Sequence, residues 1–353
     1  MAVLRPAGEF DTSYARDMAT IRRPWQWALL FGFIAALYLL PAYASQSVVA
    51  LVNRIGMSII AVQGLNLLTG LTGQISLGQA AFMTAGGYIS ALLVGRLGWS
   101  FAAALPAAAL SAGVIGLIFG LPSLRVKGFY LVMATLAAQF IIPWVTRHAF
   151  PEILNGAQGI NVQPPVLLGI AFNEPGRYLY LTLSVLILST VIAYNVSRSR
   201  LGRAFVSVRD NDLAAELLGV NLFTYRLQAF FLAAMYAGVA GALFAHSLRH
   251  INSETFNLID SVFLLGMLVV GGLGSNLGPI FGAITVELLT EAATLFGPFF
   301  VGVFPAAASG VQALRPLFFG TTLMLFLIFE PRGLAHRWLI AKAAWRLRPF
   351  SRG

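Results

Sequence analysis

The sequence predicts an all-α, polytopic membrane protein with about ten transmembrane helices, some of them broken at glycines. Of its 353 residues, 58% are hydrophobic and only 10% are charged, and the mean hydropathy is +0.80. Such a chain cannot cover a soluble domain with solvated groups. Its apolar residues also run in long stretches separated by short polar segments, which is the pattern of successive membrane spans.

The expected spans are apolar stretches of about 16 to 23 residues, because a helix of this length crosses the hydrocarbon and satisfies its own backbone polar groups there. In chain order they cover residues 25–44, 46–68, 79–95, 101–121, 128–147, 178–196, 227–247, 259–273, 279–298 and 315–330. We interpret the first as an uncleaved helix. Although Ala42-Tyr43-Ala44 resembles a signal-peptidase site, the preceding stretch has the length of a span and acidic residues precede it.

The distribution of basic residues predicts the orientation. An even number of spans places both termini on one side, and most arginines and lysines fall on that side, in segment 1–24, loop 197–226 and tail 331–353. Because an excess of positive charge marks the cytoplasmic side, we expect these segments in the cytoplasm, around a transmembrane domain at 25–330. The net charge of +10 does not indicate nucleic-acid binding, because the basic residues flank apolar runs instead of forming a stripe.

Two glycine-rich segments interrupt apolar runs, one at Gly73 and Gly78 and the other at Gly274 and Gly278. Two interpretations are open. Unwound backbone is tolerated in a membrane where it lines a cavity or is buried in protein, so paired helix breaks indicate a transport site. Alternatively, the glycines form tight turns or allow close helix packing. The turn is favoured at the second break, where Pro279 suits the start of a helix.

Polar residues gather around the first break, and five of them are candidates for a translocation path: Asn66, Gln74, Ser76, Gln79 and Thr84. Polar groups are costly in hydrocarbon, so these residues indicate either an aqueous path or hydrogen bonds between helices. On the first interpretation, their amides and hydroxyls pass a zwitterion without trapping it as a fixed charge would.

A charged, helix-sized patch separates two later spans and contains Arg209, Asp210, Asp212, Ala215, Glu216 and Gly219. Asp210 or Asn211 can cap a helix of about two turns, whose acidic residues suit its positive end, and Gly219 can end it. A cytoplasmic helix with mixed charge and an Ala/Leu stripe suits docking into a groove on a partner. A solvated loop helix without a partner is the alternative.

Little in the sequence indicates catalysis. The chain has no cysteine, its 4 histidines show no metal-ligand spacing, and neither a nucleophile elbow nor a Walker A loop occurs. We therefore expect no catalytic residue and no metal site, and any ATP must be hydrolysed by another chain. Glu287 and Glu291, one helical turn apart, form a cation or proton site, or else reach a partner subunit or the outer edge. Arg54 is expected to extend to the outer interface.

Four segments resemble a known family: GLNLLTGLTGQISLGQAAFMTAGGYISALL, PSLRVKGFYLVMATLA, GRAFVSVRDNDLAAELLGVNLFTYRLQAFFLAAMYAGVAGALFAH and LLGMLVVGGLGSNLGPIFGAITVELL. They cover most of residues 55–295 and are similar to the membrane permease subunits of ATP-binding-cassette importers of the branched-chain amino-acid type. The middle segment and the external loop look more like the M-type than the H-type member of the usual permease pair. The stretch Asn155–Ile160 matches the family's glycine-rich pattern only loosely, which puts the solute in doubt.

The resemblance implies a permease subunit of the bacterial inner membrane that moves branched-chain amino acids inward, or a related small polar solute such as urea, an amide or an aromatic acid. It implies three kinds of partner: a second permease subunit in a heterodimer, two cytoplasmic ATPase subunits that bind ATP and Mg, and a periplasmic solute-binding protein. The chain itself would need no cofactor. The patch from Arg209 to Gly219 would contact the ATPase and transmit its motion to the helix breaks.

The alternative function is a secondary transporter of a small polar solute driven by an ion gradient. In that case Glu287, Glu291 or Asp260 would be the coupling carboxylate, because a carboxylate within a span can bind and release a cation or proton.

Overall fold

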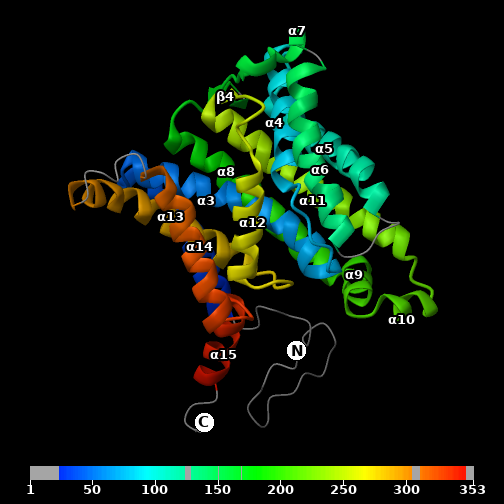
Figure 1. Ribbon diagram of the computed structural model, residues 1–353. Coiled ribbons are helices and arrows are strands. Elements are labelled where there is room, and N and C mark those ends of the chain that lie inside the picture. The colour runs from blue at the N-terminus through cyan, green and yellow to red at the C-terminus, as the bar shows by residue number, and fades with distance from the viewer. Residues whose placement is uncertain (1–23, 124–128, 150, 168, 304–310, 347–353) are drawn as a thin grey trace.

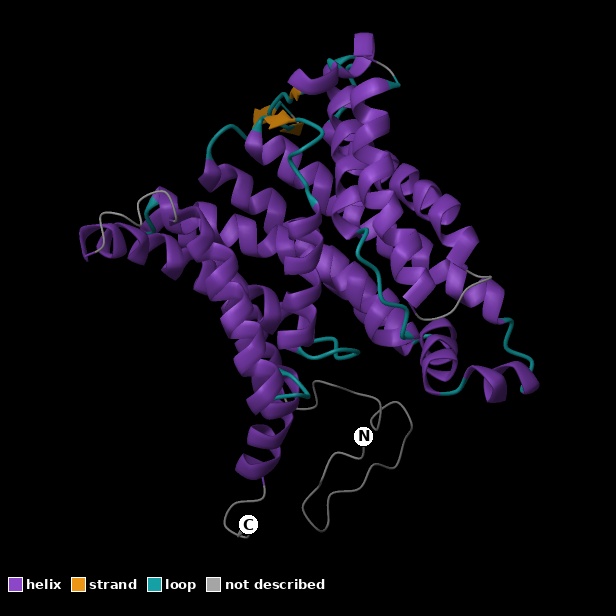
Figure 2. Cartoon of the chain, in the orientation of Figure 1, coloured by secondary structure: helices purple, strands orange, loops and turns teal. Residues whose placement is uncertain are grey.

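The computed structural model describes residues 24–123, 129–149, 151–167, 169–303 and 311–346, and within them the chain is mostly helical (Figure 1 and Figure 2). The predicted cytoplasmic segment 1–24, apart from Pro24, lies outside the described residues, as does 347–353 at the end of the predicted tail. The assignment of the segments 1–24, 25–330 and 331–353 to sides of a membrane stays a prediction.

The long helices follow one another with short connections: α2 (Pro24–Tyr43), α3 (Gln46–Leu65), the π-helix η1 (Asn66–Leu71), α4 (Gln79–Gly95), α5 (Phe101–Ser123), α6 (Phe129–His148), α8 (Pro175–Arg198), α9 (Arg200–Asp210), α10 (Asp212–Leu217), α11 (Leu222–Leu248), α12 (Leu258–Gly271), α13 (Gly278–Val303), α14 (Val311–Phe329) and α15 (Leu334–Arg346). Several begin where a side chain caps free backbone N–H groups. Asn221 caps α11, and Asn257 with Asp260 forms a capping box at α12.

The connection between α6 and α8 holds the small elements, which are α7 (Pro151–Leu154), the 3₁₀-helix η2 (Gly156–Gln158), β1 (Ile160–Asn161), β2 (Val166–Leu167) and β3 (Ile170–Ala171). β2 pairs with β3, and β1 pairs antiparallel with β4 (His250–Ile251), which directly follows α11. This pairing fixes the connection against the end of α11 that is remote from α10.

A helix lies in each of the ten stretches expected to span a membrane, but the structure does not confirm a count of ten. Six described helices are long and apolar enough to cross a membrane, and a seventh span results if the bent pair Pro316–Phe329 and Leu334–Ala344 counts as one. The glycine breaks explain part of the difference. They shorten α4 to 17 residues and α12 to 14, and 14 residues extend only about 21 Å.

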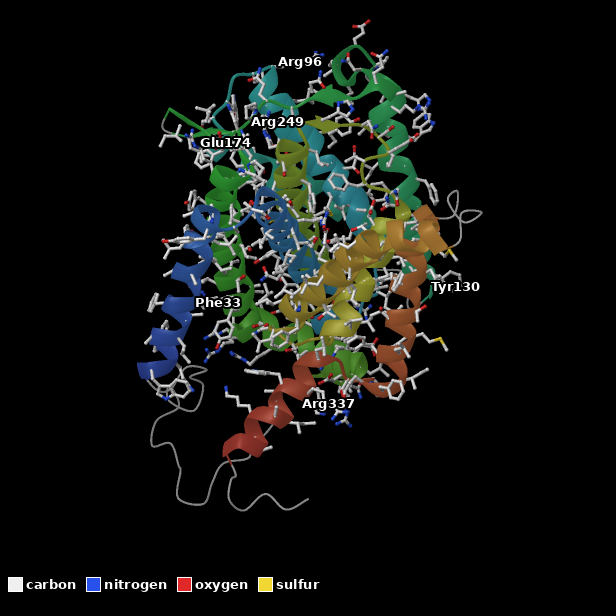
Figure 3. All side chains as sticks on the ribbon, turned by 90° about the vertical axis from the view of Figure 1, so that its left-hand side faces the viewer. Phe33, Arg96, Tyr130, Glu174, Arg249 and Arg337 are labelled. Carbon is white, nitrogen blue, oxygen red and sulfur yellow. The ribbon has the colours of Figure 1, made fainter. Side chains whose placement is uncertain are left out.

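Charged and large apolar side chains separate along the molecule. Figure 3 shows Arg96, Glu174 and Arg249 at one end and Arg337 at the other. Between these ends, Phe33 on α2 and Tyr130 on α6 are 63% and 69% exposed. Exposed apolar rings between two charged ends suit a hydrocarbon surrounding, and α2 in particular buries none of its apolar window in the protein.

The core is centred on α11, which packs against α3, α4 and α5. Its buried residues are mostly alanine and glycine. Small residues let the backbones approach closely: a Cβ added to Gly86 of α4 would lie 2.3 Å from the Cα of Gly238 in α11. Since lipid tails are as apolar as the side chains, such close contact is what favours helix–helix association over helix–lipid contact.

Candidate functional site

The first helix break is an irregular, partly buried stretch and not a tight turn: Gln74 and Ser76 are buried, whereas Ile75 is 48% exposed. α3 continues into the π-helix η1, and the chain is then irregular from Gly73 (φ 73°) to Gly78, directly before α4. Side chains of other helices bind the first backbone N–H groups of α4: the Ser261 hydroxyl accepts from Ala80 and the Gln139 amide oxygen accepts from Ala81, both at 2.9 Å. In the break itself, the Leu77 N–H donates to the Thr135 hydroxyl at 3.1 Å. Side chains of other helices therefore bind free backbone groups at and beside the break, as backbone without helical bonds requires in a membrane.

The second break is a tight turn, as favoured from the sequence. α12 ends at Gly271 and α13 begins at Gly278, and the two helices pack against each other. Gly274 has a φ of 73°, a conformation that suits glycine in a turn. The approach is so close that a Cβ on Gly282 would lie 1.7 Å from the carbonyl oxygen of Met267.

The two breaks lie side by side, although more than 200 residues separate them in the sequence. The side-chain amide of Asn66 in η1 joins them, donating to the carbonyl oxygen of Ser275 at 3.0 Å and accepting from the backbone N–H of Gly274 at 2.9 Å. A Cβ on Gly70 would lie 2.6 Å from the Gly274 nitrogen. We call Asn66, Gly70, Gly274, Ser275 and the neighbouring Arg209 the break junction.

Arg209 brings the charged loop into this junction. It lies in the last turn of α9, and its Nη1 donates to the carbonyl oxygen of Gly70 at 2.8 Å. The position of a Cβ on Gly274 would be 2.8 Å from the same nitrogen, so Arg209 contacts both breaks. Phe205 is fully buried, and its ring packs edge-on against Tyr225 of α11, which anchors α9. The sequence predicts Arg209 in a patch that faces a partner, whereas the structure turns its guanidinium toward the two breaks.

The predicted short helix is present as α10, with its predicted boundaries at both ends. Asn211 is the cap: its side-chain oxygen accepts from the Ala214 N–H at 3.0 Å, whereas Asp210 ends α9 and binds Arg209 at 3.0 Å. Gly219, with a φ of 85°, follows the end of the helix.

The remaining residues of the patch divide between two faces of α10. Ala215 is buried, and Asp212 binds Arg226 of α11 at 3.2 Å, which holds α10 against the bundle. Glu216 faces outward, and Leu217 is 88% exposed. Leu213 and Leu218 are exposed as well. The outward face of α10 is therefore apolar and carries one acid.

The five predicted path residues are all buried, and they bond mainly to other parts of the protein. Gln79 donates to the carbonyl oxygens of Ala61 and Ala233, at 2.9 and 3.3 Å, and Thr84 donates to Ala80 in its own helix. The Ser76 hydroxyl accepts from the Gly78 N–H at 3.3 Å, and Asn66 belongs to the break junction. Among the described residues, the buried Gln74 Oε1 and Gln79 Oε1 have no hydrogen-bond partner.

A cavity of about 180 Å³ lies elsewhere, between α3, α4, α11, α12 and α13. It is lined by Arg54, Ser58, Met83, Phe244, Leu248, Thr255, Phe256, Asp260, Phe263, Leu264, Met267, Glu287 and Thr290. None of the five predicted path residues is among them. In the sequence, this site is indicated by the pair of acids on α13, and nothing local links them to α3.

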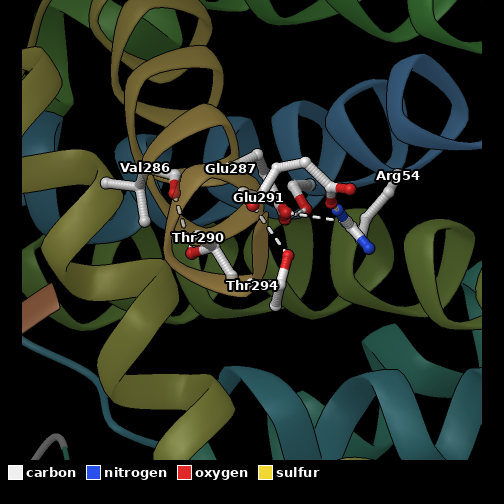
Figure 4. A network of polar contacts seen from close by, with 7 residues as sticks. Arg54, Val286, Glu287, Thr290, Glu291 and Thr294 are labelled. Carbon is white, nitrogen blue, oxygen red and sulfur yellow. Dashed lines mark hydrogen bonds and ion pairs between the residues drawn. The ribbon is translucent and has the colours of Figure 1, made fainter. Parts of the chain in front are cut away.

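An ion-pair network forms one side of this cavity (Figure 4). Arg54 binds Glu287 at 2.9 Å and Glu291 at 2.5 Å, and the Ser58 hydroxyl donates to the other oxygen of Glu287 at 2.7 Å. Glu287 is only 5% exposed. Arg54 is paired with two carboxylates of α13 while its side chain stays 37% exposed, and its expected extension to the outer interface stays a prediction. Among the described residues, no three potential ligands gather as a metal site.

Two helix breaks that meet beside a charged helix, together with a charged cavity between long apolar helices, are the features of a polytopic α-helical membrane protein of the transporter class. Residues 47–327 match the family model described as "Branched-chain amino acid transport system / permease component". The chain belongs to this family of multi-pass membrane permeases.

The relatives extend the likeness along most of the chain. "High-affinity branched-chain amino acid transport system permease protein LivM" of Escherichia coli (strain K12) is 30% identical over 330 residues, which cover 86% of this chain and 74% of the relative. The protein of the same name from Salmonella typhimurium is 29% identical over 344 residues, covering 91% and 76%. "Inner membrane ABC transporter permease protein YjfF" of Escherichia coli (strain K12) is 26% identical over 268 residues, covering 72% and 77%. The predicted likeness to M-type permeases is confirmed.

Proposed function

We propose that this chain is the M-type permease subunit of an ATP-binding-cassette importer and moves branched-chain amino acids inward across the bacterial inner membrane. The names of its relatives support this solute. In this proposal the chain hydrolyses no ATP. Its partners are two ATPase subunits on the cytoplasmic side, a second permease subunit of the H type, and a periplasmic solute-binding protein.

The observation that carries the mechanism is the contact between Arg209 and the break junction. α9 and α10 belong to the loop that faces the ATPase in this proposal, and Arg209 at the end of α9 holds Gly70 and touches Gly274. A displacement of the loop then pulls on two helix breaks at once. Since glycines absorb backbone changes easily, the breaks are where the helices on either side reorient.

The outward face of α10 is the docking surface for the ATPase. Leu213, Leu217 and Leu218 are exposed there, next to the acid Glu216. An apolar row with one charge fits a groove lined by apolar side chains and a basic residue on the partner. The ion pair of Asp212 with Arg226 links α10 directly to α11, so a displacement of α10 also moves α11. This link is additional to the contact that α9 makes with the breaks.

The buried amides near the first break support a second conformation. Gln74 Oε1 and Gln79 Oε1 have no hydrogen-bond partner among the described residues, and a buried polar atom without a partner costs about 1–3 kcal/mol. In the proposed cycle, movement at the first break gives these oxygens water or solute as partners, and Asn66, Gln74, Ser76, Gln79 and Thr84 border the inner part of the route.

The rival function, an ion-driven secondary transporter, needs a carboxylate that can exchange its cation. Glu287 and Glu291 are both paired with Arg54, and among the described residues no three acidic or histidine side chains gather to hold a metal cation. This arrangement favours the ATP-driven proposal.

Uptake in reconstituted vesicles tests the proposal. The chain and its co-purifying partners are inserted into liposomes, and uptake of labelled leucine is measured with ATP on the ATPase side or with a proton or sodium gradient alone. We expect uptake only with ATP. Gradient-driven uptake without ATP would reject the proposed function.

A variant of α10 tests the docking surface. Glu216→Ala combined with Gly219→Ala removes the acid and strains the chain after α10, because Gly219 has a φ of 85°. We expect the variant to insert into the membrane normally but to lose the co-purifying ATPase. A complex that still assembles and pumps normally would contradict the docking surface.

A further inference from the structure

The cavity between α3, α4, α11, α12 and α13 has two chemically different walls. One wall is polar and consists of Arg54, Ser58, Asp260, Glu287 and Thr290. The other is apolar and consists of Met83, Phe244, Leu248, Phe256, Phe263, Leu264 and Met267. A ligand that satisfies both walls needs a charged end and an apolar body.

The charges around the polar wall do not balance. Arg54 is bound by Glu287 and Glu291, so one guanidinium faces two carboxylates. Glu287 is buried, and a buried carboxylate favours a nearby positive charge. An ammonium group on the ligand supplies that charge.

Arg54 also has donors to offer. Its Nε binds Glu287 and its Nη2 binds Glu291, while the Nη1 group has no partner among the described residues. A ligand carboxylate is the usual acceptor for a guanidinium N–H pair. The polar wall thus presents carboxylates for an ammonium and a guanidinium for a carboxylate, which together match a zwitterion.

The size of the cavity limits the apolar body. The volume of about 180 Å³ slightly exceeds that of an apolar protein cavity of about 150 Å³ that holds benzene. There is room for a small aliphatic side chain beside the charged groups. Urea or a simple amide has neither an ammonium group nor an apolar body, so neither satisfies both walls.

We propose that this cavity is a solute-binding site for an α-amino acid zwitterion with an aliphatic side chain. The ammonium lies at Glu287 and Asp260, the carboxylate at Arg54, and the side chain against Phe244 and Phe263. The inference rests on the proposed function and deepens it, because it gives the permease a solute site of its own. The site lies toward the end of α11 that is remote from α10, about 33 Å along the helix from Leu222 to Phe244.

The absence of cysteine from the sequence allows a direct test in the full-length chain with its membrane partners. Thr290→Cys places a single thiol in the cavity wall. Thr294→Cys is a matched control one turn further along α13: both hydroxyls donate only within their own helix, to Val286 and Glu291, but Thr294 does not line the cavity (Figure 4). The rate of alkylation by a small maleimide is measured in detergent without ATP.

We expect leucine at ten times its dissociation constant to slow alkylation of Thr290→Cys about tenfold, by occupancy alone, and to leave Thr294→Cys unchanged. Under the same conditions 4-methylpentanoate, which lacks the ammonium, 3-methylbutylamine, which lacks the carboxylate, and urea should not protect. Protection by either analogue as strong as that by leucine would overturn the zwitterion assignment. Absence of protection by leucine, or a Thr290→Cys thiol that never reacts, would overturn the site.

A pair of carboxamide variants tests the charge assignment. Glu287→Gln in the Thr290→Cys background should abolish protection by leucine, whereas Glu291→Gln should retain it, because Glu291 does not line the cavity. Equal protection in both variants would contradict the role of Glu287. Because alkylation needs no ATP, loss of protection with intact ATP-driven uptake would reject only the site, whereas protection without ATP-driven uptake would reject only the proposed function.

Discussion

The Nη1 group of Arg209 donates a 2.8 Å hydrogen bond to the carbonyl oxygen of Gly70, which joins the end of α9 to the first helix break. Gly70 lies in the π-helix η1, where the α-helical pattern of backbone hydrogen bonds is interrupted. A side chain at the end of α9 therefore supplies a hydrogen bond to backbone whose α-helical hydrogen bonds are interrupted. In the proposed importer this single contact connects ATPase motion to the broken helix.

Replacing Arg209 should separate the ATPase from transport. Arg209→Ala removes the bond to Gly70 and the contact with Gly274, so we expect leucine uptake to fall at least about tenfold, the equivalent of about 1.4 kcal/mol, while ATP hydrolysis continues. Uptake per ATP hydrolysed in proteoliposomes measures this.

Arg203→Ala is the matched control for that variant, because Arg203 lies on the same helix and donates to Arg198 without reaching the breaks. Its coupling ratio should stay near that of the parent. Equal losses for both arginines would mean that α9 acts only through its total charge, against the contact proposed here.

The side-chain amide of Asn66 should contribute clearly to the stability of the fold. In Asn66→Ala, the N–H of Gly274 and the carbonyl oxygen of Ser275 both lose their side-chain partner. The carbonyl oxygen of Ser275 keeps a second donor, the Gly278 N–H at 3.3 Å, so the main cost falls on the partly buried N–H of Gly274. A buried N–H without a partner costs about 1–3 kcal/mol, so the variant should unfold at a lower temperature in detergent.

Asn276→Ala provides the comparison for Asn66. Asn276 donates to the Ser197 hydroxyl, which has a second partner in Tyr194, so no buried backbone group is left unpaired. Its loss should be about 0.5–1.5 kcal/mol. A loss in Asn66→Ala no larger than that in Asn276→Ala would contradict the bridging role of Asn66.

The sequence predicted both breaks and the short helix near Glu216, because glycine, capping and charge signals are local. It did not predict that the breaks meet. Nothing local links Asn66 to Gly274, and the contact depends on how α12 and α13 fold back on α3. For the same reason α9 was not predicted. In the sequence its residues belong to a charged patch, whereas in the structure the edge-on contact of Phe205 with Tyr225 holds them as a separate helix against α11.

The count of ten spans is not confirmed, for a related reason. Hydropathy alone does not distinguish a helix that crosses the hydrocarbon from a shorter apolar helix packed inside the bundle. α12 is such a helix: most of it is buried, including Leu268 and Ser261. The candidate cavity also lay beyond sequence reasoning, because Arg54 and Glu287 are 233 residues apart.

Gly70 should not tolerate a side chain. A Cβ there would lie 2.0 Å from the Asn66 side-chain oxygen and 2.6 Å from the Gly274 nitrogen, and the second atom belongs to the backbone and cannot move away cheaply. Gly70→Ala should therefore separate the two breaks and cost about 1–3 kcal/mol, as overpacking does. Thermal unfolding in detergent measures the change.

Gly95 near the end of α4 is the matched glycine. A Cβ there would meet nothing within 4 Å, so Gly95→Ala should be neutral or stabilise the helix by up to about 1 kcal/mol. If Gly70→Ala were equally neutral, the close approach of the two breaks would not contribute to stability.

The ion-pair network of Arg54 should show strong coupling between its members. Arg54→Met leaves the buried Glu287 with Ser58 as its remaining partner, and removal of one member of a buried pair typically costs about 3–5 kcal/mol. Adding Glu287→Gln removes the buried charge while keeping an oxygen for the Ser58 hydroxyl, so the double variant should recover most of that loss. Thermal unfolding of the parent, both single variants and the double variant gives the coupling free energy.

Glu291→Gln combined with Arg54→Met is the control. The Glu291 side chain is 35% exposed and solvent screens its charge, so this double variant should recover little of the stability lost in Arg54→Met. Additive losses for Arg54→Met and Glu287→Gln would show that the two side chains do not stabilise each other, and that the polar wall of the cavity is organised differently.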